Sequence, residues 1–90
     1  DKGRIEELLA KGEVDMVTFT SSSTVVNFVE MFQDEDQRLR EWMAEVTVAC
    51  IGPITAKTAR ENGLEMDLIP EKYTIESLTH AIVRHFSSAP

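Results

Sequence analysis

The stretch Val48-Ala49-Cys50-Ile51-Gly52-Pro53-Ile54-Thr55-Ala56 decides how this chain folds. Its first half is apolar, as in the buried strands of parallel sheets. The Gly-Pro pair then ends the strand, and the small residues after it are typical of a helix that begins at once. A strand followed directly by a helix is the repeating unit of α/β folds, whose ligands bind at the turn between the two. We therefore expect a functional site at Gly52-Pro53.

Outward from this stretch, the chain alternates between helical and strand patterns. Apolar residues at helical spacing, with capping residues and glycine stops, predict helices over residues 4–11, 25–32, 36–43, 53–62 and 75–86. Short β-branched or apolar runs predict strands over residues 16–20, 46–51 and 64–68. This order predicts an α/β fold with three layers, in which helices flank a parallel sheet. We expect 46–51 to be the central strand, 64–68 to be a half-exposed edge strand, and 87–90 to be a frayed tail.

The last predicted helix carries its large apolar residues on one face, which we expect to pack on the sheet. These residues are Ile75, Leu78, Ile82, Val83 and Phe86.

Composition excludes several classes of protein. The chain has 90 residues, enough for one small domain, and it opens at Asp1 in a helical pattern, so we expect it to be part of a longer protein. Its formal net charge is −7, from 16 acidic and 9 basic side chains, which argues against a binder of duplex nucleic acid. It has no apolar run near the roughly 20 residues of a membrane span and no signal peptide.

The single cysteine, Cys50, lies inside the apolar run, where we expect a buried and unreactive thiol. One cysteine forms no internal disulfide, which fits a reducing compartment, and we expect a cytoplasmic protein.

Two turns stand out as candidates for ligand binding, Thr20–Thr24 and Gly52–Thr55. Both follow parallel strands, so both lie at the same edge of the sheet, where the amides of the next helix favour anions. The hydroxyls of Ser21, Ser22 and Ser23 and of Thr55 would add uncharged donors. The alternative stays open, since serine and threonine at helix starts are most often only caps and Gly-Pro is most often only a turn. Neither turn has the pattern of a phosphate-binding loop.

Other polar residues are weaker candidates. Tyr73 precedes a helix at the same edge, so its hydroxyl could face the site, although a packing role is the more common outcome. His80 and His85 lack partners with metal-ligand spacing, and the acidic run 34–36 lacks the pattern of a calcium loop.

The first predicted strand, 16–20, has apolar residues on both faces but no further strand to pair with. We expect an open sheet edge that pairs with another part of the parent protein, swaps, or promotes self-association.

Three segments together resemble uroporphyrinogen-III synthase. They are Phe19-Thr20-Ser21-Ser22-Ser23-Thr24-Val25 with Phe28, Ile51-Gly52-Pro53-Ile54-Thr55-Ala56 with Ala59 and Gly63, and Tyr73-Thr74-Ile75-Glu76-Ser77-Leu78. Their order and spacing are similar to the carboxy-terminal third of that family, from about residue 15 to residue 86.

The resemblance implies a lyase of tetrapyrrole biosynthesis, the route to haem, sirohaem and cobalamin. The family has two α/β domains joined by a two-stranded linker, and this chain would be part of one flavodoxin-like domain. The family closes the linear tetrapyrrole hydroxymethylbilane with loss of water and inversion of ring D, and it uses no metal or organic cofactor. It binds substrate carboxylates largely through backbone amides and hydroxyls at strand-to-helix turns. The partners implied are hydroxymethylbilane and the remainder of the enzyme.

Carried over by position, the resemblance assigns substrate binding to both turns and to the tyrosine. The candidate residues are Thr20, Ser21, Ser22, Ser23, Gly52, Pro53, Ile54, Thr55 and Tyr73. Ile54 stands where the family often has threonine, so one hydroxyl is absent. The family's candidate acid, a tyrosine, belongs to a segment upstream of Asp1, so no catalytic residue is assigned here. The competing hypothesis is a non-catalytic α/β module that binds small anions or regulates another protein.

Overall fold

Two short parallel strands form the sheet at the centre of the structure. Strand β1 (Met16–Phe19) pairs with β2 (Thr47–Cys50), and the register runs from Met16 opposite Thr47 to Phe19 opposite Cys50. The structure is a computed structural model that describes residues 2–87. The α/β fold with a parallel sheet, predicted from the sequence, is confirmed.

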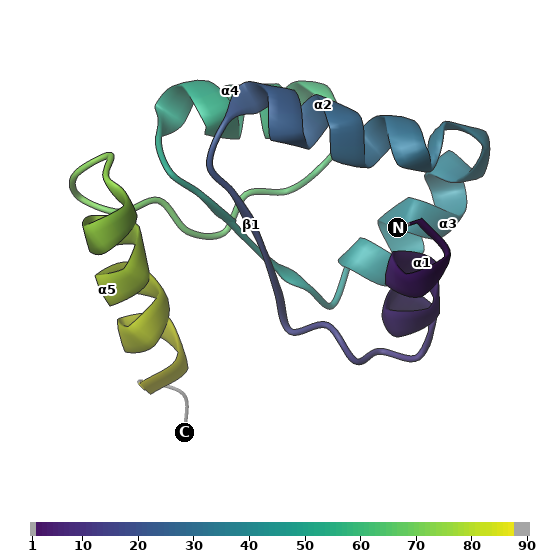
Figure 1. The fold of residues 1–90 in the computed structure, drawn as a ribbon, viewed down its shortest axis with the longest axis horizontal. Helices are drawn as coiled ribbons and strands as arrows, with labels where there is room; N and C mark the ends of the chain where they lie inside the picture. Colours follow the sequence, from purple (N-terminus) through teal and green to yellow (C-terminus); the bar gives the residue numbers. More distant parts are fainter. Residues whose placement is uncertain (1, 88–90) are drawn as a thin grey trace.

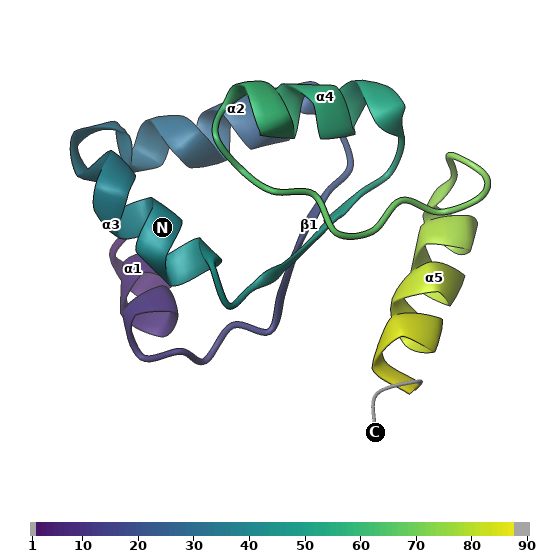
Figure 2. The ribbon, with the colours of Figure 1, turned by 180° about the vertical axis from the view of Figure 1, so that it is seen from behind.

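Helices connect and cover these strands (Figure 1). Their bounds are α1 Lys2–Ala10, α2 Ser22–Met31, a 3₁₀ turn Gln33–Glu35, α3 Asp36–Met43, α4 Pro53–Glu61 and α5 Ile75–Ser87. Helices α2 and α4 lie side by side, as Figures 1 and 2 both show, and α1 contacts α3. Ser87 belongs to α5, and the rest of the predicted frayed tail lies outside the described residues.

The helices stop where the sequence signals predict. Gly12 follows α1 with a φ of 69°, and Gly63 follows α4 with a φ of 85°. This left-handed region disfavours residues that carry a Cβ, so glycine ends both helices at little cost. At the start of α5, Thr74 Oγ1 accepts a hydrogen bond from the Ser77 amide at 3.1 Å, so Thr74 caps this helix.

The main core fills the space between one face of the sheet and four of the helices. Its buried members are Leu9, Phe19, Val25, Phe32, Leu39, Met43, Val46, Val48, Cys50, Ala56, Ala59 and Leu64. A chain of edge-to-face aromatic contacts ties β1, α2 and α3 together, with centroid distances of 5.5 Å for Phe19–Phe28, 5.6 Å for Phe28–Phe32 and 6.0 Å for Phe32–Trp42. Such contacts add to the stabilisation that burial alone provides.

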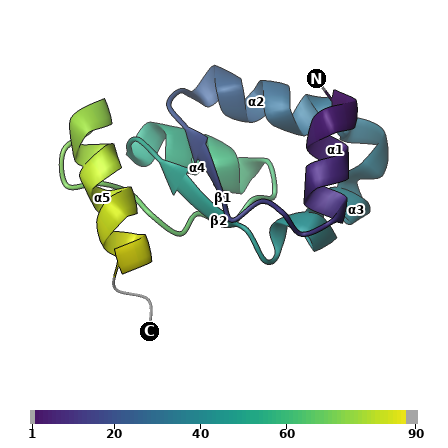
Figure 3. The ribbon, with the colours of Figure 1, turned by 60° about the horizontal axis from the view of Figure 1, so that its bottom comes forward.

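Helix α5 covers the opposite face of the sheet. Side chains alternate along a strand, so Ala49, which is fully buried, faces away from the core that holds Val48 and Cys50. Helix α5 contacts β2, and its Leu78 and Ala81 are buried outside that core. Figure 3 shows α5 on one side of the two strands and α1 and α3 on the other. The helices therefore flank the sheet in three layers, as expected.

The predicted apolar face of α5 is only partly buried. Leu78 is buried and Ile82 is half-buried, but Ile75, Val83 and Phe86 are 58%, 57% and 48% exposed. The prediction that all five residues pack on the sheet is wrong, because two strands offer too narrow a surface to cover the whole face of a helix.

The prediction of a third strand over residues 64–68 is also wrong. Only Leu68 forms a parallel bridge, with Ala49, although this does make β2 central. The Leu68 carbonyl accepts from the Cys50 amide at 2.9 Å, but the Val48 amide donates instead to the Asp67 carboxylate at 2.8 Å. A side chain thus takes the place of a backbone carbonyl, and the regular ladder ends.

Asp67→Ala should destabilise the protein. The variant leaves the amide of Val48, a residue that is 2% exposed, without its acceptor, and an unsatisfied buried donor costs about 1–3 kcal/mol. The midpoint of urea unfolding measures the loss. Asp67→Asn keeps an oxygen acceptor and should lose less, and Glu65→Ala, at an exposed carboxylate nearby, should lose almost nothing. Equal midpoints for Asp67→Ala and Glu65→Ala would show that water satisfies the Val48 amide.

Within residues 2–87, β1 pairs on one side only, with β2. Helix α5 covers the face of β2 on which Ala49 lies. Thr18 of β1 is paired with Ala49 and is exposed, so the same face of β1 is not covered. The predicted open edge is therefore present in the described part of the chain.

None of the helices in this part is long and apolar enough to cross a membrane.

Candidate functional site

Both predicted turns begin at one edge of the sheet. The parallel strands end in register at Phe19 and Cys50, and the Ile51 amide donates to the Phe19 carbonyl at 3.0 Å just beyond them. Helices α2 and α4 start from these ends and run side by side, so their amino termini point toward the same edge. The juxtaposition predicted from parallel pairing is confirmed.

The serine turn, Thr20–Thr24, satisfies much of its own hydrogen bonding. Ser21 is the N-cap of α2, with φ −156° and ψ 158°, and its Oγ accepts from the Thr24 amide at 3.3 Å. Thr24 Oγ1 donates to the Ser21 carbonyl at 2.6 Å, and the hydroxyls of Ser21 and Ser23 lie 3.1 Å apart. The alternative noted for such residues, a capping role, therefore holds for Ser21. Thr20 and Ser23 are exposed and accessible to a ligand.

The turn at Gly52-Pro53 is different, because nothing in it caps the helix. Gly52 is the N-cap of α4 and has no side chain to accept a hydrogen bond, and Pro53 has no amide hydrogen. The first helical bond is donated by the Ala56 amide to the Gly52 carbonyl at 3.0 Å. The amides of Ile54 and Thr55 have no acceptor among the described residues. This helix end therefore presents two free donors and the positive end of its dipole.

Thr55 adds a third donor to this end of α4. Its side chain is 5% exposed and is the one buried polar side chain in the described core. Its hydroxyl makes no hydrogen bond with another residue in the range 2–87. Thr55 Oγ1 is not among the buried side-chain oxygens that lack a partner, so this hydroxyl still reaches solvent although the residue as a whole is buried. It is therefore free to donate to an acceptor that approaches the turn.

Tyr73 lies over the Gly52 backbone. A Cβ placed on Gly52 would lie 3.2 Å from Tyr73 Cγ and 3.4 Å from Cδ1, which is closer than ordinary contact. The ring is still 62% exposed, so Tyr73 combines a packing contact with an accessible surface. Ile54, in the first turn of α4, is 78% exposed. Apolar surface thus lies next to the free amides.

Ser22 contacts α4 through a residue that sequence reasoning missed. Its Oγ lies 3.0 Å from Thr58 Oγ1, one turn beyond Thr55 on α4. The sequence indicates a role for Thr58 only through its spacing of three residues from Thr55, and this spacing does not predict which helix Thr58 faces. The contact joins the start of α2 to the second turn of α4.

Cys50 lies directly before the turn and is fully buried, as predicted. Burial raises the pKa of its thiol, and the charge of Arg60 opposes this shift in part. A thiol with a raised pKa is a poor nucleophile at neutral pH. Cys50 therefore supports the site by packing.

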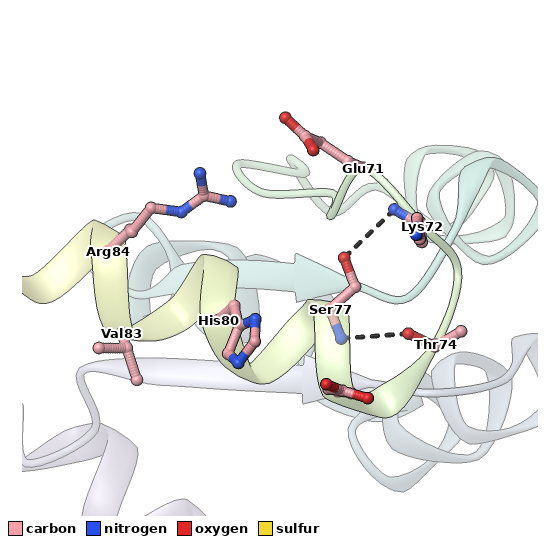
Figure 4. A pocket seen from close by; sticks show the side chains of 8 residues that line it. Glu71, Lys72, Thr74, Ser77, His80, Val83 and Arg84 are labelled. Atoms are coloured by element: carbon pink, nitrogen blue, oxygen red, sulfur yellow. Dashed lines mark hydrogen bonds between the residues drawn. The ribbon is translucent and has the colours of Figure 1, made fainter.

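An open pocket of about 640 Å³ lies elsewhere, along the outer side of α5 (Figure 4). Lys72 and Arg84 line it, but so do Glu71 and Glu76, so its charges balance. Its polar groups are partly used, since Ser77 Oγ accepts from the Lys72 amide at 3.2 Å. None of the predicted site residues lines this pocket, so we place the candidate site at the two turns.

Comparisons with known proteins agree with this arrangement. The family model described as uroporphyrinogen-III synthase HemD matches residues 1–80. A uroporphyrinogen-III synthase of Chlorobaculum parvum is 34% identical over 82 residues, which are 91% of this chain and 31% of that protein. A protein of Methanothermobacter thermautotrophicus that is provisionally named as the same enzyme is 40% identical over 85 residues, 91% of this chain and 33% of its own length.

The fold has solved counterparts as well. A crystal structure of wild-type uroporphyrinogen III synthase from the extremely thermophilic bacterium Thermus thermophilus aligns with a TM-score of 0.81 at 30% sequence identity, over 97% of this chain and 35% of that one. The chain therefore spans about a third of the length of the relatives it matches. Because the family model matches most of its residues and the fold agrees, the chain belongs to the uroporphyrinogen-III synthase family.

Proposed function

We propose that this chain forms one wall of the substrate cleft in a uroporphyrinogen-III synthase that cyclises hydroxymethylbilane to uroporphyrinogen III. The reaction loses water and inverts ring D, and it supplies tetrapyrroles such as haem. The observation that carries the proposal is the uncapped start of α4, with the free amides of Ile54 and Thr55 beside the unpartnered Thr55 hydroxyl.

The chemistry of this helix end suits a carboxylate. Free amides and a helix dipole bind negative charge without a basic side chain, which fits a chain with a net charge of −7. Gly52 has no side chain, and the Tyr73 ring takes the space in which a Cβ would stand, so the glycine lets the tyrosine pack against the backbone of the turn. The linear tetrapyrrole carries a carboxylate on each of its side arms, so one arm binds at the start of α4.

The serine turn is assigned to a second carboxylate arm. Exposed hydroxyls of Thr20 and Ser23 and the first amides of α2 lie at the same edge as α4. Because Ser21 already caps α2, this turn offers fewer free donors than the α4 turn, and we assign it the weaker contact. The exposed surfaces of Tyr73 and Ile54 face the apolar faces of the pyrrole rings in this proposal.

The remainder of the two-domain enzyme is the partner for the rest of the site. It supplies the second wall, the catalytic acid and the strand that pairs with β1, whose outer edge is open in the described residues. Relatives about three times as long as this chain support that assignment. Without such a partner, an unpaired edge promotes self-association between copies. The lone reduced cysteine and the pathway support a cytoplasmic location.

Thr55→Val in the full-length enzyme tests the proposal. Valine keeps the shape of the buried side chain but removes the hydroxyl, so only the donor to the carboxylate is lost. Hydrogen bonds to charged groups contribute about 1.5–3 kcal/mol, so kcat/KM should fall about 10- to 100-fold, mainly through KM.

Two variants serve as controls. Thr55→Ser keeps the hydroxyl and should retain most of the activity. Thr79→Val removes a hydroxyl that bonds only within its own helix, to the Ile75 carbonyl at 2.9 Å, and should leave the kinetics unchanged. If Thr55→Val matches Thr79→Val, Thr55 is a packing residue and the assignment of its hydroxyl to the carboxylate is wrong.

A further inference from the structure

We propose that Thr58 is a positioning residue that sets the serine turn against the start of α4, so that both turns bind one ligand together. The inference rests on the proposed function. Its basis is the 3.0 Å contact between Thr58 Oγ1 and Ser22 Oγ, with the Ile54 carbonyl 3.2 Å from the same threonine oxygen.

The three groups form a short hydrogen-bonded chain. A threonine hydroxyl has one proton, so Thr58 donates either to Ser22 Oγ or to the Ile54 carbonyl. In the second case Ser22 donates to Thr58, and every group in the chain is satisfied. In both cases a bond crosses from the first turn of α2 to the second turn of α4. Both residues are half-buried, which protects the bond from competition by water.

Packing between α2 and α4 does not provide this restraint by itself. Val25, Ala56 and Ala59 are fully buried in the core, and the two alanines have small side chains. These residues interdigitate with the rest of the core and limit sliding, but small side chains such as alanine present shallow ridges, so a directional bond restrains the offset further. A hydrogen bond has a narrow range of length and angle. The paired strands set the approximate offset between the starts of α2 and α4, and the Thr58–Ser22 bond adds a directional restraint to that offset.

This offset matters for a ligand with several carboxylates. One arm at the Thr55 turn and another at the serine turn bind together only if the spacing of the turns matches the spacing of the arms. If the two turns already stand at this spacing before the ligand binds, binding loses less conformational entropy, as in other preorganised sites. Thr58 touches no ligand in this account and acts through Ser22.

The test uses the full-length enzyme with Thr58→Val, Thr58→Ser and Ser22→Ala. Thr58→Val removes the hydroxyl and should raise the KM for hydroxymethylbilane about fivefold with kcat nearly unchanged. Thr58→Ser keeps the hydroxyl and should restore KM. Ser22→Ala removes the bond from the other helix and should raise KM as much, and the double variant should be no worse than either single one.

The outcomes separate the inference from the proposed function. A raised KM in Thr58→Val, with rescue by Thr58→Ser, supports positioning even if Thr55→Val is silent, in which case the Thr55 contact alone is wrong. Unchanged KM in both Thr58→Val and Ser22→Ala overturns the inference, whether or not Thr55→Val has an effect. A lower melting temperature with unchanged KM also overturns it, because the bond then only stabilises the fold. If Thr58→Val does not fold, Thr58→Ala, which also removes the hydroxyl, takes its place and is judged by the same criterion.

Discussion

Residues 1–90 produced alone should form no type III product from hydroxymethylbilane above the type I product that arises without enzyme. The chain holds one wall of the proposed cleft, and ring closure needs the two ends of the substrate held together from both sides. Holding reacting groups in place is worth about 10⁵-fold or more in rate, and a single wall does not provide it. The assay uses freshly made substrate, separates the two isomers, and compares the chain with the full-length enzyme at equal concentration.

The result is informative in either direction. Type III product that rises in proportion to the concentration of the 90-residue chain would show that the catalytic group lies within these residues. It would also contradict the assignment of the acid to the remainder of the enzyme. If adding that remainder as a separate chain restores activity, the open edge of β1 and the bare face at Thr18 are the surfaces to examine for the contact.

Gly52→Val in the full-length enzyme should lower kcat/KM about 100-fold, as the loss of a preorganised amide donor does elsewhere. The backbone at Gly52 is extended, with φ −165° and ψ 179°, so a larger residue adopts it without strain. The effect comes instead from bulk, because even a Cβ would lie 3.2 Å from Tyr73 Cγ. A valine pushes the ring aside, and we expect the displaced ring and the added bulk to hinder a ligand that approaches the free amides of Ile54 and Thr55.

Two companion variants identify the cause. Gly52→Ala combined with Tyr73→Ala removes the steric conflict and is compared with Tyr73→Ala alone. The two should have the same melting temperature, and kcat/KM should be lower in the double variant because the added methyl group reduces the space for a ligand at the turn. Gly3→Ala, at an exposed position of α1, is the control and should leave kcat/KM unchanged while slightly raising the melting temperature, because alanine favours the helix. Full activity in Gly52→Val would mean that no ligand approaches this turn closely.

Local patterns predict most of the elements, and the reason is visible in particular residues. The caps at Ser21 and Thr74 and the stops at Gly12 and Gly63 act within one or two turns of chain, so their effect does not depend on distant contacts. Parallel pairing then brings the two turns to one edge. Thr20–Thr24 and Gly52–Thr55 could therefore be placed together from the sequence.

The errors have a common physical origin. The alternation of Leu64–Leu68 is typical of a strand, but the Asp67 carboxylate binds the Val48 amide and replaces a rung of the ladder. The apolar residues of α5 are typical of a buried face, but a sheet of two strands leaves Ile75 and Phe86 largely exposed. In both cases the pattern is present in the sequence, and the outcome depends on what lies opposite it in the fold.

The sequence by itself determined the α/β order, the parallel sheet and the two turns at its edge, because these follow from local propensity and from the direction of the strands. Only the tertiary structure decided that the turns are unequal. Ser21 caps α2, whereas the start of α4 keeps its amides and the Thr55 hydroxyl free, and Thr58 joins the two helices through Ser22. These differences depend on which side chain meets which partner across space, and the spacing of residues along the chain does not contain that information.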